Sequence, residues 1–351
     1  MTLSTDDLRA AIASGIVTEA QTAKLIAFSE ARRLAKDTVA EVEEPFVLFK
    51  GFNEIFVVVG LSILFTGWVG VAVLFGLNME VPAGIVTVLL SVATLAGLAA
   101  AASYFTMKRR MIAPSIALSI MTAMTATVLG FAMVGVDGAF ASMAVALIVA
   151  AVMSGFYAAF RVPFAAALIA GAVFIAAASG LNGAGMLGED AFGALLFGAT
   201  GPLSVMTVAF GLGVFALAMR LDLSDPMRVS TRSATAFWLH IVAAPAIVNS
   251  IALNLLKSGG LGGQAALVVF LTVLAMIAIV IDRRSFLVSG AGYSVVLASA
   301  VFGGGSAYAV LVLGLILVLL GAKWDQIRAR LMAALPAFPG KFRLPPYGVV
   351  S

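Results

Sequence analysis

The chain of 351 residues is 62% hydrophobic and only 11% charged, with a formal net charge of +4. A soluble domain carries about a quarter of its residues as charged side chains, so this composition excludes an ordinary soluble protein. The chain has no cysteine and a single histidine, which excludes disulfides, thiolate nucleophiles and the usual zinc and iron ligand sets within one chain. We therefore expect no metal site and no cofactor.

The N-terminal polar region, 1–50, is expected to form a cytoplasmic helical hairpin and linker. Ser4 can cap a first helix and Gly15 suits its end, while Thr18 and Gln21 match the capping box S/T-x-x-E/Q of a second helix. A DNA-reading helix-turn-helix is the alternative, but six basic and eight acidic residues make the region net acidic. DNA binding depends on neutralising phosphates, so we expect no nucleic-acid partner. No apolar core of a signal peptide precedes residue 53, so we expect the N-terminus to be retained.

Long uncharged segments then alternate with short charged ones. A transmembrane helix needs about 20 mainly apolar residues to cross a hydrocarbon core roughly 30 Å thick. Ten segments meet this requirement, with boundaries good to about three residues: 53–77, 82–106, 113–134, 139–160, 163–181, 194–220, 235–256, 263–281, 285–303 and 305–322. The abundant Gly and Ala let helices approach closely in lipid. The sequence predicts an all-α, polytopic transmembrane bundle of about ten spans in region 51–322.

Basic residues are distributed unevenly between the two sides of this bundle. If the chain crosses ten times, 20 of the 21 Lys and Arg residues lie on the side of the termini, and only Lys257 lies opposite. Short loops rich in Lys and Arg mark the cytoplasmic side. We therefore expect both termini to be in the cytoplasm.

Apart from Arg220 at the last position of the sixth span, Glu54 and His240 are the only acidic or basic side chains within the ten predicted spans. Charged groups inside a membrane usually mark ion or substrate pathways, so their scarcity argues against an ion channel or a pump with a carboxylate relay. Glu54 stands at the start of the first span, where the helix dipole favours a carboxylate. A proton carrier at Glu54 is the alternative.

The seventh span combines four unusual residues in one apolar run: His240, Pro245, Asn249 and Asn254. Pro245 lacks the N–H of a helix hydrogen bond, so the helix should bend or recruit a polar neighbour. His240 and Asn249 are nine residues apart and therefore lie on opposite faces of a straight helix. Hydrogen bonds between helices are favoured, and a functional polar site inside the membrane is the alternative.

Pro202 interrupts the sixth predicted span. Two adjacent proline-interrupted helices are typical of transporters, although simple membrane bundles also contain them. The connection 221–233 that follows is the most polar loop. Its charged residues are expected to form exposed ion pairs worth about 0–1 kcal/mol each: Asp222 and Asp225 with Arg220, Arg228 and Arg232. A solvated loop is favoured over a binding site for a charged partner.

The C-terminal region, 323–351, begins with an amphipathic helix over 323–335 and ends in a proline-rich tail. A basic amphipathic helix beside a membrane usually lies in the headgroup region. We expect Trp324, Arg328 and Arg330 to anchor this helix at the membrane interface.

Three segments resemble an uncharacterised family of proteobacterial polytopic inner-membrane proteins. They are STRSATAFWLHIVAAPAIVNS (230–250), DRRSFLVSGAGYS (282–294) and LVLGLILVLLGAKWDQIRARLMAALP (311–336). LRAAIASGIVTEAQTAKLIAF (8–28) is similar to the cytoplasmic start of bacterial membrane proteins of unknown function. The family pattern often has a second histidine where this chain has Asn249. The resemblance implies the bacterial cytoplasmic membrane and no particular activity.

The lack of buried charge favours a non-catalytic integral membrane protein with a structural or accessory role in a membrane assembly. The expected partners are the lipid bilayer and a membrane-protein partner or a second copy. The alternative is a transporter for an apolar or amphipathic small solute or lipid that uses the spans around Pro202 and Pro245. No nucleophile–base pair or metal set can be chosen from the sequence, so we do not expect an enzyme.

Overall fold

A computed structural model of the protein describes residues 11, 14–18, 21, 22, 51–78, 81–138, 140–187, 201–228, 230–302, 306–345 and 347. The chain divides into two units, Met1–Val47 and Leu48–Ser351.

The first unit contains the helix end and the capping box that the sequence predicts. Gly15 has a φ of +70°, and the Ile16 N–H donates to the Ala11 carbonyl at 3.0 Å, as in a Schellman helix end. The Thr18 N–H donates to Gln21 Oε1 at 2.9 Å, and the Gln21 N–H donates to Thr18 Oγ1 at 3.2 Å. Both local predictions are confirmed, while Ser4 and most of the expected hairpin lie outside the described residues.

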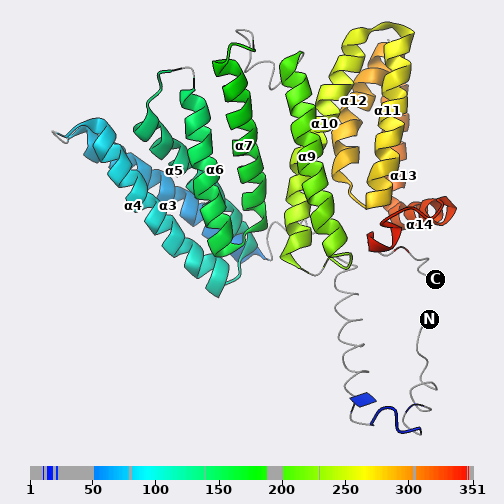
Figure 1. The fold of residues 1–351 in the computed structure, drawn as a ribbon, viewed down its shortest axis with the longest axis horizontal. Coiled ribbons are helices and arrows are strands. Elements are labelled where there is room, and N and C mark those ends of the chain that lie inside the picture. The colour runs from blue at the N-terminus through cyan, green and yellow to red at the C-terminus, as the bar shows by residue number, and fades with distance from the viewer. Residues whose placement is uncertain are drawn as a thin grey trace. The chain divides into compact units, whose positions relative to one another are not determined.

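The second unit is built from helices that follow the predicted apolar segments (Figure 1). Its elements are α3 (Phe52–Leu77), α4 (Ala83–Ala102), the π-helix η1 (Ser103–Lys108), α5 (Ile112–Val134), α6 (Ala141–Phe160), α7 (Pro163–Gly183), α9 (Pro202–Ser224), α10 (Thr231–Ser258), α11 (Gly260–Ile281), α12 (Ser285–Phe302), α13 (Ser306–Ala322), α14 (Trp324–Ala334) and the 3-10 turn η3 (Lys341–Arg343). The described part of the chain contains no strand. The all-α prediction is therefore confirmed for the described residues.

Eight helices of the described chain are long and apolar enough to cross a membrane. They are α3, α4 continued by η1, α5, α6, α7, α9, α10 and α11. The chain is thus a multi-pass helical membrane protein. The helices α12 and α13, with 18 and 17 residues, are not among the eight, so a total of ten crossings stays a prediction.

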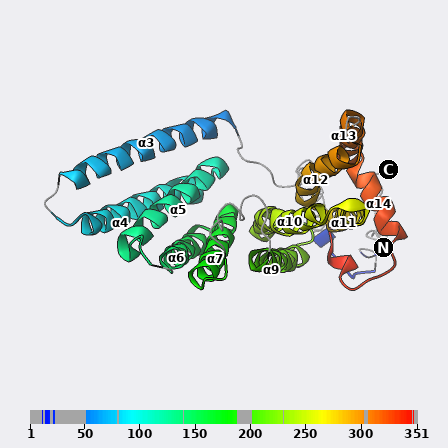
Figure 2. The same cartoon turned by 90° about the horizontal axis from the view of Figure 1, so that it is seen from above.

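The helices α4, α5, α6, α7, α10 and α11 of the second unit stand side by side in a row (Figure 2). In this row α4 contacts α5, α5 contacts α6, α6 contacts α7, and α7 contacts α10. The helix α10 also packs on α9, α11 and α12. The helix α3 lies along one side of α4 and α5 (Figure 2). The junction between α7 and α10 includes an edge-to-face contact of Phe164 with Trp238, whose ring centroids are 4.7 Å apart.

Small residues allow the closest approaches between neighbouring helices. A Cβ added to Gly211 of α9 would lie 2.8 Å from Ile247 Cγ1 and 3.2 Å from the Ile247 backbone nitrogen on α10. A Cβ on Gly130 of α5 would lie 2.9 Å from Val145 Cγ1 on α6. The prediction that glycine permits close helix packing in lipid is confirmed at these positions.

Proline has different effects in α9 and α10. Pro202 is the first residue of α9, a position where the missing N–H costs no helix hydrogen bond. The prediction that Pro202 interrupts a span is therefore wrong. Pro245 does lie inside a helix: α10 has 28 residues in total and continues past Pro245 to Ser258.

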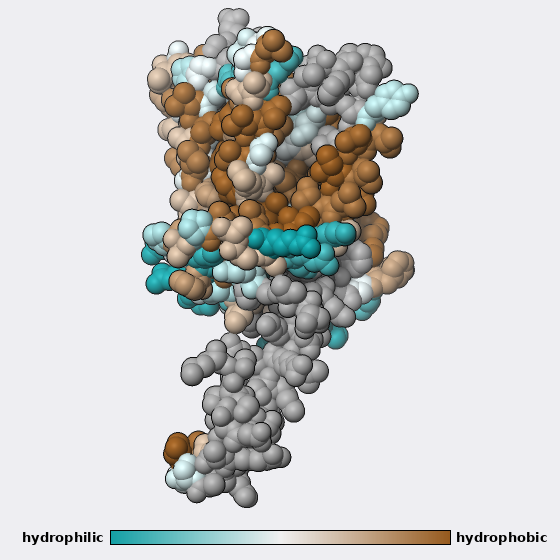
Figure 3. All heavy atoms as spheres, turned by 90° about the vertical axis from the view of Figure 1, so that its right-hand side faces the viewer, coloured by the Kyte–Doolittle hydropathy of each residue, from teal (hydrophilic) through white to brown (hydrophobic). Residues whose placement is uncertain are grey.

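The outer surface of the second unit is strongly apolar. On the face seen in Figure 3, hydrophobic side chains cover the height of the helices and hydrophilic ones gather in a band at one end. On α3, for example, Ile63 and Leu64 are 69% and 70% exposed. Such a continuous apolar surface suits a lipid environment, because soluble monomers rarely expose apolar patches of this extent.

Candidate functional site

Three charged or polar side chains meet inside the second unit at Asp222, which lies near the end of α9. Arg283, in the turn between α11 and α12, donates from Nε to Asp222 Oδ2 at 3.0 Å and from Nη2 to Asp222 Oδ1 at 2.5 Å. His240 of α10 places Nε2 2.9 Å from Asp222 Oδ2. The three side chains, which we call the inner cluster, are buried, with Asp222 4% exposed and the other two 0% exposed.

The ion pair of the inner cluster determines which nitrogen of His240 carries the proton. Asp222 is paired with Arg283 and is therefore an acceptor, so His240 donates to it from Nε2, and a neutral imidazole in this arrangement carries no hydrogen on Nδ1. His240 Nδ1 has no hydrogen-bond partner among the described residues, and neither do the hydroxyls of Ser233 and Ser285. Within the described part of the chain, no hydroxyl is bonded to the imidazole.

Aromatic rings enclose the imidazole on its other sides. The ring of Phe215 on α9 lies 5.6 Å from that of His240, and the ring of Phe286 on α12 lies 5.9 Å away, both edge-to-face. The two phenylalanine rings also contact each other at 5.5 Å. The imidazole thus fills a packed core position, which supports the predicted role of His240 in contacts between helices.

Asp222 corrects two sequence-based predictions. The helix α9 extends to Ser224, so Asp222 belongs to a predicted membrane-crossing helix and not to the loop. Asp222 was expected to form an exposed pair with a neighbouring arginine, yet it is buried and pairs with Arg283, 61 residues away. Local spacing gave no signal for this pairing, because the two residues approach only through the packing of α9 against α10 and α12.

A second set of polar contacts, the outer cluster, surrounds Asp282, the residue that ends α11. Arg228 donates from Nη1 to Asp282 Oδ2 at 2.9 Å and from Nη2 to the Asp282 carbonyl at 2.7 Å. Trp324 Nε1 donates to Asp282 Oδ1 at 2.6 Å. Asp282 adopts a left-handed conformation with a φ of +58°. The outer cluster therefore ties the connection after α9, the end of α11 and the start of α14 to one residue.

The three predicted interface anchors are placed differently from one another. Trp324 and Arg328 are 3% and 4% exposed, and Arg328 donates to the carbonyls of Ile279 at 3.2 Å and Pro345 at 2.7 Å. Burial lowers the pKa of the Arg328 guanidinium from its ordinary value, while the nearby Asp282 carboxylate acts in the opposite direction. Both side chains fasten α14 to α11, and only Arg330 is exposed.

The two asparagines of α10 point to different surroundings. Asn254 Nδ2 donates to Ser204 Oγ on α9 at 2.8 Å, which is the type of interhelical hydrogen bond that the sequence predicts. Asn249 is exposed, whereas His240 is buried. The structure therefore confirms that His240 and Asn249 lie on different faces of α10 and does not bring them into one site.

Glu54 has a partner that the sequence did not indicate. It lies in the first turn of α3, as expected, but its Oε2 accepts hydrogen bonds from the backbone N–H groups of Ile112 at 3.2 Å and Ala113 at 3.0 Å. These are free N–H groups at the start of α5. Glu54 therefore caps a different helix from its own and fastens the first turn of α3 to α5.

A cavity of about 810 Å³ lies between α3, α4 and α5. Its walls are mostly apolar and include several hydroxyl side chains: Ser62, Thr66, Thr87, Ser91, Thr94 and Thr125. Trp68 of α3 donates from Nε1 to Thr94 Oγ1 of α4 at 2.7 Å, which links two walls. Several lining residues, such as Val73 and Met124, each 56% exposed, also reach the apolar surface. The cavity is thus accessible from the surface that would face lipid.

The described residues contain no group of three or more His, Asp or Glu side chains that could hold a metal ion. No protein-family model, curated protein or solved structure matches the chain. In the described part of the chain, the buried ionic clusters around α9–α14 and the apolar cavity between α3, α4 and α5 are candidates for a function.

Proposed function

We propose that the protein binds a lipid, or an amphipathic molecule of similar build, in the cavity between α3, α4 and α5. One observation carries this proposal: about 810 Å³ of space is bounded by three apolar helices with a few hydroxyl groups. Pockets for small molecules typically have about 300–1,000 Å³, apolar walls and a small number of polar groups. Because lining residues are exposed on an apolar surface, the ligand enters from the bilayer.

The weak attachment of α3 supports this proposal. None of its membrane-crossing window is buried, and Glu54 is its only buried residue among the side chains that are described. A segment with few buried apolar contacts opens at a low free-energy cost. In the proposal, α3 moves away from α4 when the Trp68–Thr94 hydrogen bond opens, while Glu54 holds its first turn on α5.

The proposed ligand site does not include the spans around Pro202 and Pro245. Pro202 begins a helix, and the inner cluster near Pro245 is buried and occupied by its own ion pair. The ionic clusters hold the helices of α9–α14 together. The cavity lies in the other half of the second unit, where polar contacts between helices are few.

Photo-crosslinking tests the proposal. Purified protein is reconstituted in nanodiscs that contain a phospholipid with a diazirine on its acyl chain, and labelled peptides are identified by mass spectrometry. We expect labelling to concentrate on residues that line the cavity. Ala72→Trp fills the cavity from α3 and should reduce that labelling severalfold.

Ala96→Trp is the matched control, because Ala96 of α4 is exposed and does not line the cavity. It should leave the labelling pattern unchanged. Labelling spread evenly over all exposed helix faces, and insensitive to Ala72→Trp, would contradict lipid binding in the cavity.

An accessory role in a membrane assembly is the second candidate, and the unburied α3 favours it. A transmembrane helix of a partner, or of a second copy, would cover the same helix. Native mass spectrometry of protein extracted gently into nanodiscs from its own membrane separates the two candidates. A defined second polypeptide supports the accessory role, whereas the protein alone with a retained lipid supports ligand binding.

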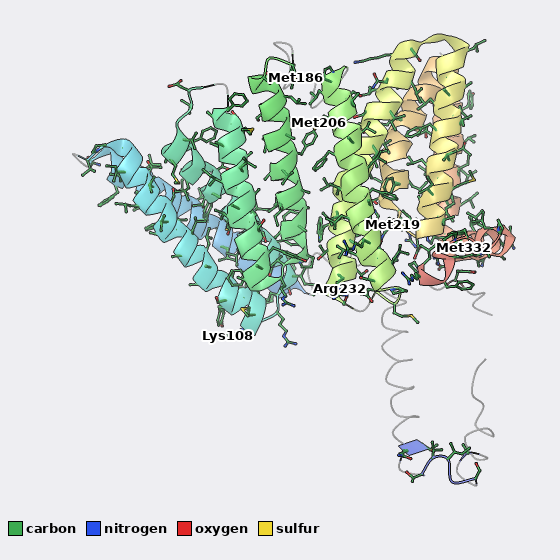
Figure 4. All side chains as sticks on the ribbon, in the orientation of Figure 1. Lys108, Met186, Met206, Met219, Arg232 and Met332 are labelled. Carbon is green, nitrogen blue, oxygen red and sulfur yellow. The ribbon has the colours of Figure 1, made fainter. Side chains whose placement is uncertain are left out.

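We infer that the protein lies in the bacterial cytoplasmic membrane with both termini in the cytoplasm. This inference is supported by Lys108 and Arg232, which lie at the same end of the second unit (Figure 4), because basic loops mark the cytoplasmic side. The chain has no cysteine, so single cysteines report topology cleanly. A membrane-impermeant maleimide applied to intact cells should label Asp137→Cys but not Arg161→Cys, and the reverse pattern would invert the topology.

A further inference from the structure

We propose that the ligand of the cavity is a phospholipid with an anionic headgroup, and that Lys108, Arg109 and Arg110 bind its phosphate. This inference rests on the proposed lipid binding in the cavity between α3, α4 and α5. It adds the chemical class of the lipid and the residues that select it.

The three basic residues lie beyond the end of the cavity that is marked by Val58 of α3 and Ala117 of α5. They form the connection between η1 and α5, directly before the backbone N–H groups of Ile112 and Ala113 that bind Glu54. Val58 of α3 lines the cavity one helical turn, about 6 Å, after Glu54. Because Glu54 joins the first turn of α3 to the start of α5, the basic connection lies about one to two helical turns beyond the lining residues Val58 and Ala117, which is within the length of a phospholipid whose acyl chain enters the cavity.

The charge at this connection is unbalanced. Lys108, Arg109 and Arg110 are all exposed, and Glu54 is the only acid in α3, α4, η1 and α5. Glu54 is buried, and its carboxylate is already bound to two backbone N–H groups. The exposed basic groups are therefore available for an external anion.

One of the guanidinium groups is held in place before any ligand binds. Arg109 donates from Nε to the Tyr104 hydroxyl at 3.1 Å, and its guanidinium lies 5.6 Å from the centre of the Tyr104 ring. Guanidinium groups bind phosphate oxygens with charge-assisted hydrogen bonds, and a pre-positioned group loses less entropy on binding. An acyl chain in the apolar cavity and a phosphate at the basic connection together match an anionic phospholipid.

The test compares two lipids that differ only in headgroup. Purified protein is placed in nanodiscs with equal amounts of phosphatidylglycerol and phosphatidylcholine of the same acyl chains, and retained lipid is counted by native mass spectrometry. We expect phosphatidylglycerol to be retained preferentially. Replacing Lys108, Arg109 and Arg110 with Gln should lower that preference by about fivefold for each charge removed, with phosphatidylcholine retention unchanged.

One control separates these three residues from a general surface charge, and a change of salt concentration tests whether the headgroup selection is electrostatic. Arg232→Gln removes an exposed positive charge at the same end of the unit but far along the helix row on α10 (Figure 4), and it should leave the preference intact. For the unmodified protein, raising the salt from about 0.1 M to about 1 M shortens the Debye length from about 10 Å to about 3 Å. The preference should then fall without any substitution.

The outcomes separate this inference from the proposed function. Equal retention of both lipids, sensitive to Ala72→Trp, would overturn the headgroup selection and leave lipid binding in place. Retention of neither lipid would overturn both. An equal loss of preference in Arg232→Gln, or displacement of the lipid by inorganic phosphate alone, would also overturn the assignment to these three residues and an anionic phospholipid.

Discussion

Asp222 and Arg283, which are 61 residues apart in the chain, form a bidentate ion pair inside the second unit. The same carboxylate binds His240, so α9, α10 and the turn before α12 meet at one residue. Buried charges are costly to leave without a partner. The stability of this half of the protein should therefore depend on the complete set of three side chains.

Asp222→Asn should lower the free energy of unfolding by about 3–5 kcal/mol, because it leaves the buried Arg283 guanidinium without a counterion. Denaturant titration or thermal melting in a mild detergent measures the change. Asp137→Asn is the control, since Asp137 is exposed. The double variant Asp222→Asn/Arg283→Gln should recover part of the loss, and equal stability of Asp222→Asn and Asp137→Asn would contradict the role of the pair.

His240→Ala should destabilise the protein, whereas Asn249→Ala should not. His240 is buried and bonded to a charged carboxylate, and such hydrogen bonds contribute about 1.5–3 kcal/mol. Asn249 lies on the exposed side of the same helix. Melting temperatures of the two variants give the comparison, and equal losses would contradict a stabilising role that is specific to the buried His240.

Gly211→Ala should lower stability by about 1–3 kcal/mol, because the new Cβ would lie 2.8 Å from Ile247 Cγ1 and 3.1 Å from Ala246 Cβ. Gly213→Ala, two residues further along α9, meets nothing within 4 Å. It should leave stability unchanged or raise it by about 0.4–1 kcal/mol. The contact of α9 with α10 is misplaced if both variants melt at the same temperature.

Glu54→Ala should speed hydrogen exchange at the backbone N–H groups of Ile112 and Ala113. These groups bind the Glu54 carboxylate and, as the first N–H groups of α5, have no partner within their own helix. Asn53→Ala changes an exposed neighbour and should leave the exchange slow. Hydrogen–deuterium exchange with mass spectrometry measures both, and slow exchange in Glu54→Ala would refute the cap.

Several features of the fold could be predicted from single stretches of sequence. The apolar runs predicted where the helices lie, because membrane-length helices satisfy all their backbone hydrogen bonds internally. Thr18 and Gln21 predicted a capping box, and the spacing of His240 and Asn249 predicted opposite faces. Each of these predictions depends on residues within a few helical turns of one another.

The site could not be predicted in the same way. The sequence predicts a solvated loop for the charged residues of 221–233. In the structure α9 continues to Ser224, and Asp222 is buried in the interior. Trp324 and Arg328 match a membrane anchor on a helical wheel, but α11 and the C-terminal segment cover them. A wheel shows which residues share a face, and it does not show what covers that face.

The length and apolar character of each segment are local properties, so they identify a multi-pass helical membrane protein without knowledge of how the helices pack. Three features became visible only in the folded chain: Glu54 caps α5, Asp222 pairs with Arg283, and α3, α4 and α5 leave a cavity between them. The first two depend on contacts between segments that are 58 and 61 residues apart in the chain. The physical reason is that interhelical packing selects among many possible pairings of similar apolar faces, and local spacing does not distinguish them.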